Sequence, residues 1–179
     1  MSFLKLEMFY LASTDESLNQ QVCLGNSELF DKAKGKALQL LDNVGVVVDT
    51  IRIKFELVTR EQMNEYGEKN IGLHFPLTYG SKIWILEKQT LLLTISTLAH
   101  ELGHAWISQN KIKLPLIEEE GFCQVLSYYA LCSEFSKEGN HEADLVKSWA
   151  DEIYGDGFRL MKRKLDCLGW KQFIMLIKF

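Results

Sequence analysis

The spacing of hydrophobic residues changes character near the middle of the chain. Residues 51–58, IRIKFELV, alternate apolar and polar side chains, as in a strand with one buried face. Residues 71–87 continue as one or two strands, with a turn at 79–81. From about residue 89 onward the apolar side chains follow a helical period instead. The pattern predicts an α+β fold, with a small mixed or antiparallel sheet in the N-terminal half and a helical C-terminal half.

Helices are expected on both sides of the strand-forming segment. Residues 27–43 carry an apolar stripe behind Ser27, a residue type that caps helices, and residues 60–67 are expected to form a short helix. In the second half, helices are predicted over residues 89–109, 117–135, 140–154, 157–168 and 170–178. The length favours a single domain over residues 1–179, with residues 1–26 as an extended arm.

Composition and charge narrow the classes of partner. The net charge of −4 argues against a nucleic-acid or acidic-membrane partner, whose phosphates need a clustered basic surface. The four cysteines, Cys23, Cys123, Cys132 and Cys167, form no C-x-x-C pair and suit free thiols in a reducing compartment. The N-terminus lacks the pattern of a signal peptide, and no run is long enough to span a bilayer. We therefore expect a cytoplasmic protein, with export by a signal-independent route left open.

The segment LAHELGHAWISQN, residues 98–110, places two of the chain's four histidines in an otherwise apolar helix. His100 and His104 are four positions apart, so their rings project from one helix face and can hold one metal ion. Glu101 falls beside that ion without ligating it, where a general base is needed. The alternative is a pair of hydrogen-bonded core histidines, but a charged glutamate in so apolar a segment is costly without a partner. The spacing H-E-x-x-H therefore predicts a catalytic zinc site in a zincin-like fold.

The third protein ligand is expected from the acidic run IEEEGF in the next helix. Acids at the start of a helix also favour the positive end of its dipole, which accounts for part of the run. Glu120 precedes Gly121, a residue that lets helices approach closely, and Glu-Gly-aromatic at the head of a helix resembles the third-ligand motif of glutamate zincins. We assign Glu120 as the ligand, Glu119 as the fallback, and Gln124, one turn further on, as a side chain that orients a ligand.

Two other sources of the third ligand are weaker. Metzincin sites place a glycine three residues and a histidine six residues after the second zinc histidine, and Ile107 and Asn110 stand there instead. His141 is the other imidazole of the second half, and a site using it would resemble the SprT-like DNA-associated proteases. The acidic charge balance argues against that alternative.

The segments HELGHAW, EEEGFCQVL and YGDGFR (residues 154–159) together resemble the DA-one-like peptidases. These form the C-terminal metallopeptidase region of a plant LIM-domain family that restrains organ growth, and they also occur in bacteria. LVTREQMNE and GEKNIGLHFPLTYG are similar to the family's upstream segment, so the resemblance covers about residues 58–179. It implies a zinc peptidase that cuts protein substrates, with His100, His104 and Glu120 as ligands and Glu101 as base.

The chain departs from the family pattern in several places. Leu102 and Gly103 stand where the family often has two methionines, and the long insert that plant members carry before the zinc helix is absent. Four cysteines leave no LIM zinc module, and there is no ubiquitin-interacting helix. Only the catalytic unit therefore carries over from the resemblance.

A peptidase also needs a donor for the oxyanion of its tetrahedral intermediate, and Tyr154, Arg159 and His141 are the candidates. For YGDGFR we prefer a structural interpretation, in which Gly155 ends one helix, Asp156 caps the next and Arg159 pairs with an acid.

The segment 73–77 could hold a substrate backbone by strand addition, although Pro76 removes one donor. His74, taken alone, is interpreted as a surface histidine in a loop. The expected function is that of a zinc-dependent endopeptidase or aminopeptidase. An ImmA-like regulatory protease, which shares H-E-L-G-H, and a non-catalytic interaction domain are the alternatives, and the intact Glu101 argues against the second. The substrate, the mode of activation and the oligomeric state are not indicated.

Overall fold

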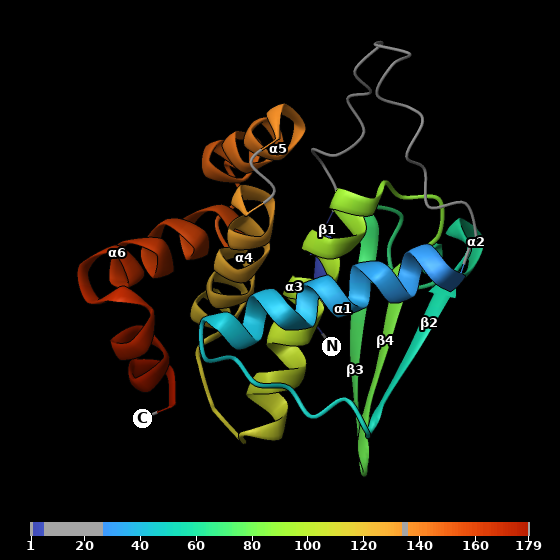
Figure 1. Ribbon diagram of the computed structural model, residues 1–179, viewed down its shortest axis with the longest axis horizontal. Helices are drawn as coiled ribbons and strands as arrows, with labels where there is room; N and C mark the ends of the chain where they lie inside the picture. The colour runs from blue at the N-terminus through green and yellow to red at the C-terminus, as the bar shows by residue number, and fades with distance from the viewer. Residues whose placement is uncertain (1, 6–26, 134–135, 179) are drawn as a thin grey trace.

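The computed structural model describes residues 2–5, 27–133 and 136–178 (Figure 1). Its strands are β1 (Ser2–Lys5), β2 (Ile53–Val58), β3 (Asn70–Leu77) and β4 (Gly80–Leu86). Its helices are α1 (Ser27–Asn43), α2 (Arg60–Asn64), α3 (Leu91–Gln109), α4 (Leu116–Cys132), α5 (Lys137–Ser148) and α6 (Tyr154–Lys178). The α+β architecture expected from the hydrophobic pattern is confirmed.

The four strands form one mixed sheet in the order β1-β3-β4-β2. The hairpin partners β3 and β4 are antiparallel, β1 is antiparallel to β3, and β2 is parallel to β4. Strand β2 begins two residues later than its alternation predicted, since Ile51 is 93 % exposed. The alternation also predicted a larger difference in burial between the two faces of β2 than the structure has. Phe55 and Leu57 are only half-buried. Glu56, between them, accepts a hydrogen bond from Trp84 Nε1 at 2.6 Å.

Helix α3 lies at the centre of the fold. It packs against β3 and β4 on one side, α1 on another and α4 on a third, and α6 in turn packs on α4 (Figure 1). Because α3 has neighbours on several sides, every residue from Thr94 to Ile107 is buried. The main hydrophobic core runs through these layers, from Phe30 and Ala33 of α1 to Phe173 and Ile177 of α6.

The C-terminal helices differ from prediction at several boundaries: α5 spans Lys137–Ser148 rather than residues 140–154, and α6 starts at Tyr154 rather than at residue 157. Helix α6 begins at Tyr154, because the Asp151 carboxylate accepts hydrogen bonds from the backbone N–H groups of Ile153 and Tyr154. The expectation that Gly155 ends a helix is therefore wrong, and the cap is Asp151 rather than Asp156. The break predicted between residues 168 and 170 is confirmed, since Gly169 has non-helical angles with φ of 71°.

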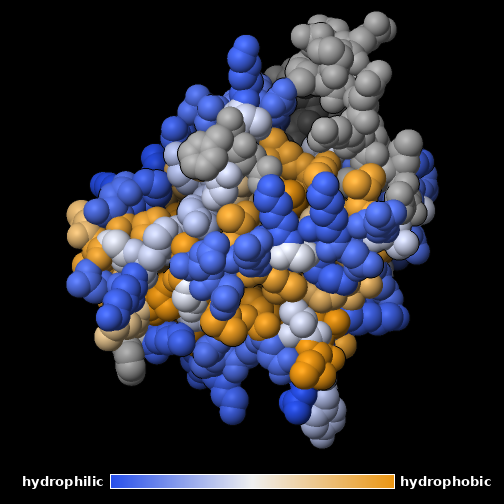
Figure 2. Space-filling model, in the orientation of Figure 1, coloured by the Kyte–Doolittle hydropathy of each residue, from blue (hydrophilic) through white to orange (hydrophobic). Residues whose placement is uncertain are grey.

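The surface on the face shown in Figure 2 is mostly hydrophilic, with apolar side chains scattered among charged ones. None of the helices in the described ranges is long and apolar enough to cross a membrane. Cys123, Cys132 and Cys167 are free thiols, as expected, whereas Cys23 lies outside the described residues.

Candidate metal centre

Helix α3 carries the H-E-x-x-H segment in its buried middle. The helix starts cleanly, because the Thr90 side chain accepts a hydrogen bond from the Leu93 backbone N–H. His100, Glu101 and His104 follow some two and a half turns later. Their side chains are 0–2 % exposed, so no bulk water offsets the cost of burying them.

Three side-chain atoms from α3 and α4 meet at one point. His100 Nε2 lies 3.1 Å from His104 Nε2, and Glu120 Oε2 lies 3.3 Å from the first nitrogen and 3.5 Å from the second. Ligands that hold zinc tetrahedrally at about 2.0–2.1 Å stand about 3.3–3.4 Å from one another. The three separations therefore match the edges of a tetrahedral metal site, and the sequence-predicted ligands are brought together.

Glycines allow α4 to approach its neighbours closely. A Cβ atom on Gly103 of α3 would lie 2.9 Å from Cys123 Sγ of α4, so a side chain there would push the two ligand-bearing helices apart. Gly121, next to Glu120, faces α6 instead, where a Cβ atom would lie 2.2 Å from the carbonyl oxygen of Gly157. The close helix approach expected at Gly121 is therefore present, but it fixes α4 against α6 rather than against α3.

Cys123 offers a second choice of third ligand. Its sulfur and the ligand nitrogens of His100 and His104 all lie within 4.8 Å of one another, so these three residues could hold a metal ion. The thiol is fully buried, and burial raises the pKa of Cys123 to about 12, with the charge of His104 opposing. Glu120 Oε2 lies 3.3 and 3.5 Å from the two nitrogens, and the pKa of Glu120 lies below its usual range: burial alone would raise it, but the hydrogen bonds to His100 and His104 outweigh burial. An already ionised oxygen is the better donor, so we favour Glu120.

The outer ring nitrogens of His100 and His104 also have partners on α4. His100 Nδ1 lies 3.1 Å from Gln124 Oε1, and His104 Nδ1 lies 3.0 Å from Glu119 Oε1. An oxygen acceptor at Nδ1 fixes the tautomer that leaves Nε2 free to bind metal. Glu119, the fallback ligand of the sequence analysis, is thus placed behind His104 and not among the three converging atoms.

Glu101 lies between the sheet and the group formed by His100, His104 and Glu120. A Cβ atom on Gly72 of β3 would stand 2.6 Å from Glu101 Oε1, so only glycine leaves room for this carboxylate. Among the described residues, neither carboxylate oxygen of Glu101 has a hydrogen-bond partner. Burial, opposed by the charge of His104 and aided by that of Glu120, raises the pKa of Glu101 to about 8. A buried carboxylate without a hydrogen-bond donor is rare in a folded protein and marks a functional site.

His74 belongs to the same neighbourhood, which corrects its interpretation as a surface histidine. It lies in β3, is 5 % exposed, and its ring stacks on that of His104 with 6.2 Å between ring centroids. Its Nε2 is 2.9 Å from Ser81 Oγ of β4. Burial, aided by the charge of His104, lowers the pKa of His74 to about 3, so its ring is neutral. The strand pattern of residues 71–87 held the signal, because His74 and Gly72 are two apart and so share a sheet face.

Comparison with known families identifies the chain. A family model described as DA1-like, Protein DA1, matches residues 18–150, which include the H-E-x-x-H helix and the acidic start of α4. The chain belongs to the DA1-like family. The resemblance inferred from the motifs is thereby confirmed, although the match begins well before residue 58 and ends before the YGDGFR segment. Searches among curated proteins and among solved structures gave no match.

The oxyanion candidates of this DA1-like chain differ in their placement. Tyr154 is 6 % exposed and its ring stacks on Trp149; burial raises the pKa of its phenol, and the charges of Glu120 and Glu101 raise it further. The Tyr154 hydroxyl therefore keeps its proton.

Arg159 and His141 lie elsewhere. The Arg159 guanidinium donates to Asp156 Oδ1 and to the carbonyl oxygen of Trp149, so the expected pairing with an acid is present. His141 is exposed on α5. No contact between the described residues joins either side chain to His100 or His104.

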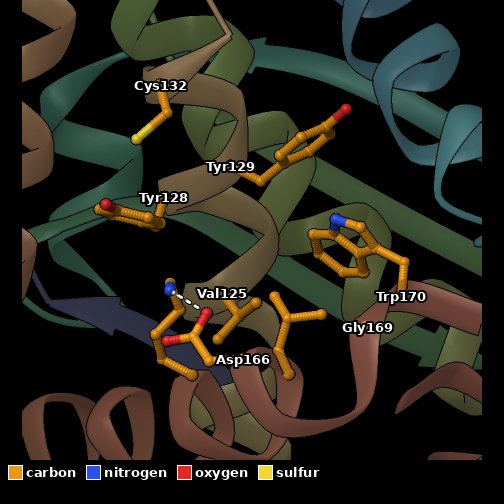
Figure 3. A pocket seen from close by; sticks show the side chains of 9 residues that line it. Val125, Tyr128, Tyr129, Cys132, Asp166, Gly169 and Trp170 are labelled. Carbon is orange, nitrogen blue, oxygen red and sulfur yellow. Dashed lines mark hydrogen bonds and ion pairs between the residues drawn. The ribbon is translucent and has the colours of Figure 1, made fainter. Parts of the chain in front are cut away.

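A pocket of about 340 Å³ opens between α4 and α6 (Figure 3). Tyr128, Tyr129 and Cys132 of α4 face Trp170 and Asp166 of α6 across it, and the Asp166 carboxylate accepts a hydrogen bond from Lys162. None of the converging side chains of α3 lines this pocket.

Proposed function

We propose that this DA1-like protein is a zinc-dependent peptidase of the glutamate-zincin type, which hydrolyses peptide bonds in protein substrates. The observation that carries the proposal is the convergence of His100 Nε2, His104 Nε2 and Glu120 Oε2 at mutual distances of 3.1–3.5 Å, with the Glu101 carboxylate beside them. Membership of the DA1-like family supports it.

The side chains present suit Zn²⁺. Two imidazole nitrogens and one carboxylate oxygen are the donor set of a catalytic zinc site, which keeps one position for water or substrate. The buried Glu101 carboxylate, which has no hydrogen-bond donor among the described residues, is also accounted for by a nearby cation and the water it binds. When bound, Zn²⁺ supplies a Lewis acid that polarises the peptide carbonyl and makes water easier to deprotonate.

Glu101 acts as the proton carrier. Its carboxylate takes a proton from the attacking water and later delivers that proton to the nitrogen of the departing amine. Burial raises its pKa, and a nearby cation would favour the ionised carboxylate that accepts this proton. Gly72 matters here because its missing side chain lets the carboxylate stay close to the substrate-side strand β3.

Tyr154 is the proposed donor to the developing oxyanion. Its phenol keeps its proton, and the influence of the Glu120 and Glu101 charges on its pKa supports the assignment. Donors of this kind contribute about 100- to 1,000-fold to the rate in other enzymes. Gln124 and Glu119 hold the two imidazoles in orientation from behind.

The deciding experiment combines metal analysis with proteolysis. The purified chain is analysed for bound metals by mass spectrometry and incubated with a peptide library and with casein, beside its Glu101→Gln variant. We expect one zinc per chain in both proteins and cleavage only by the wild type. Equal cleavage by both proteins refutes the role of Glu101, and a zinc-loaded but inert wild type leaves a binding domain as the function.

A further inference from the structure

The edge of the sheet next to the candidate metal centre is occupied by β1. Strand β3 has β4 on one side from Gly72 to Leu77, and β1 on the other side from Asn70 to His74. In Figure 1, β1 stands at the edge of the sheet nearer to α4, which carries Glu120. Any further strand that pairs with this stretch of β3 must therefore take the place of β1.

This stretch of β3 is also the one that touches the reactive side chains. Gly72 lies against the Glu101 carboxylate, and His74 stacks on His104. Their cross-strand partners in β1 are Leu4 and Ser2, respectively. The backbone of residues 2–4 thus runs along the sheet edge at the level of the side chains that would act on a peptide bond.

The side chains of the candidate site are shielded from solvent in this structure. His100, Glu101, His104 and Glu120 are at most 2 % exposed, yet a peptidase must admit a peptide to these groups. Zincin-type catalysis on a protein needs an extended segment beside the metal, and the free edge of a strand is the usual place to hold one. Here that edge is already taken.

We propose that β1 is an autoinhibitory strand that sits in the substrate position, and that a peptide binds this protein by replacing residues 2–5 along β3. The inference rests on the proposed function, because it identifies the edge of β3 as the substrate-binding edge. Strand β1 suits an exchangeable occupant. It has four residues, β3 is its one neighbour among the described strands, and its register shifts between Leu4 and Lys5.

The test uses the full chain carrying Glu101→Gln, so that the probe stays intact. The probe is a fluorescent peptide with the sequence of residues 2–7, SFLKLE, and binding is measured by polarisation with zinc and without it. Neighbouring residues of an edge strand alternate in which N–H groups face the partner strand, so either Phe3→Pro or Leu4→Pro removes a bond to β3. Leu4→Val is the matched control, because it keeps the backbone N–H.

We expect at least one proline variant to bind the probe about tenfold more tightly than its parent, because the occupied edge lowers the fraction of competent protein. Leu4→Val is expected to bind like the parent. If folded proline variants, verified by circular dichroism, bind no more tightly than Leu4→Val, the inference is overturned.

Hydrogen exchange on the parent protein gives a second reading that needs no proline variant to fold. With the probe at saturation, the amides of residues 2–5 are expected to lose protection while those of Gly72–His74 keep it. Probe binding with residues 2–5 still protected, or no binding at concentrations up to millimolar, overturns the inference. If the probe displaces residues 2–5 but the wild-type protein hydrolyses no peptide, the peptide-binding edge of β3 is supported and the peptidase is refuted. The two proposals can therefore fail independently.

Discussion

Gly72 and Glu101 are matched across the junction of sheet and helix: a Cβ atom on Gly72 would stand 2.6 Å from the Glu101 carboxylate oxygen. Such a contact must be relieved, and the end of the glutamate side chain moves more easily than the strand backbone. We expect Gly72→Ala to keep the metal but to lower kcat/KM about 100-fold, since a shift of about 1 Å in a reacting group can cost that much. Zinc content and peptide cleavage measure the two effects.

Gly35→Ala is the control for this substitution. Gly35 lies in α1, and a Cβ atom there has no neighbour within 4 Å. Alanine at an open helix position is expected to leave activity unchanged and to stabilise the protein slightly, by about 0.5–1 kcal/mol. Full activity in Gly72→Ala would show that Glu101 need not keep its present position.

Glu119 and Glu118 are neighbours with separate partners, and this allows a paired experiment. Glu119 meets His104 Nδ1 at 3.0 Å, whereas Glu118 bonds Lys164 of α6 at 2.9 Å. We expect Glu119→Gln to weaken zinc affinity about 10- to 100-fold, because the partner of a metal-binding imidazole sets its basicity and orientation. Glu118→Gln makes the same change of charge one residue away and is expected to leave zinc affinity within a few-fold of wild type. Competition with a coloured chelator measures both, and equal losses would assign the effect to net charge.

The choice between Glu120 and Cys123 as third ligand can be made by substituting each. Glu120→Gln is expected to abolish stoichiometric zinc binding under conditions in which Cys123→Ser retains it. Absorption spectra of the Co²⁺-loaded protein provide a second readout, because a thiolate ligand adds a strong sulfur-to-metal charge-transfer band. Such a band in the wild type, together with loss of zinc from Cys123→Ser, would transfer the ligand role to the cysteine.

The sequence was most informative where local chemistry fixes the structure. The spacing of His100, Glu101 and His104 placed them correctly on one helix, because a helical period needs no tertiary information. Helix α1 was predicted over its observed range, residues 27–43, since its buried residues recur at helical spacing. The position of Gly169 likewise marked the break in α6.

Most other tertiary partners were beyond the same reasoning, although the acidic run and the position one turn further on did direct Glu120 and Gln124 to the histidines. The three consecutive acids contact different partners: Glu118 contacts Lys164, Glu119 contacts His104, and Glu120 contacts both His100 and His104. No rule of residue spacing predicts which acid contacts which partner. His74 was misjudged because its burial depends on the pairing of β3 with β4, which puts Ser81 within reach of its ring. The pairing of β1 with β3 joins residues about 70 positions apart and left no local signal.

Gly121 and Gly157 define the contact between α4 and α6. A Cβ atom on Gly121 would lie 2.2 Å from the Gly157 carbonyl oxygen, and here the obstacle is backbone rather than a movable side chain. We expect Gly121→Ala to destabilise the fold by about 2–4 kcal/mol, as overpacking against a helix backbone does at the upper end of its range. Chemical denaturation measures the change, with Gly35→Ala again as control. A loss below about 1 kcal/mol would mean that the two helices separate easily.

Glu142 supplies a test of electrostatics away from the metal centre. It lies half-buried in α5, and its Oε2 has no hydrogen-bond partner among the described residues. Burial raises the pKa of Glu142 above 4.5, and the charge of His141 opposes this only in part. The folded chain therefore holds this proton more tightly than the unfolded chain, and Glu142 costs stability as pH rises from the unfolded pKa through the folded one.

Glu142→Gln removes that cost and keeps the shape. Its melting temperature is expected to exceed that of the wild type by about 1–3 °C at pH 7 and to equal it near pH 4. Thermal denaturation between pH 4 and pH 7 measures this difference in melting temperature. A difference that stays constant across this range would show that the ionisation of Glu142 does not cause it.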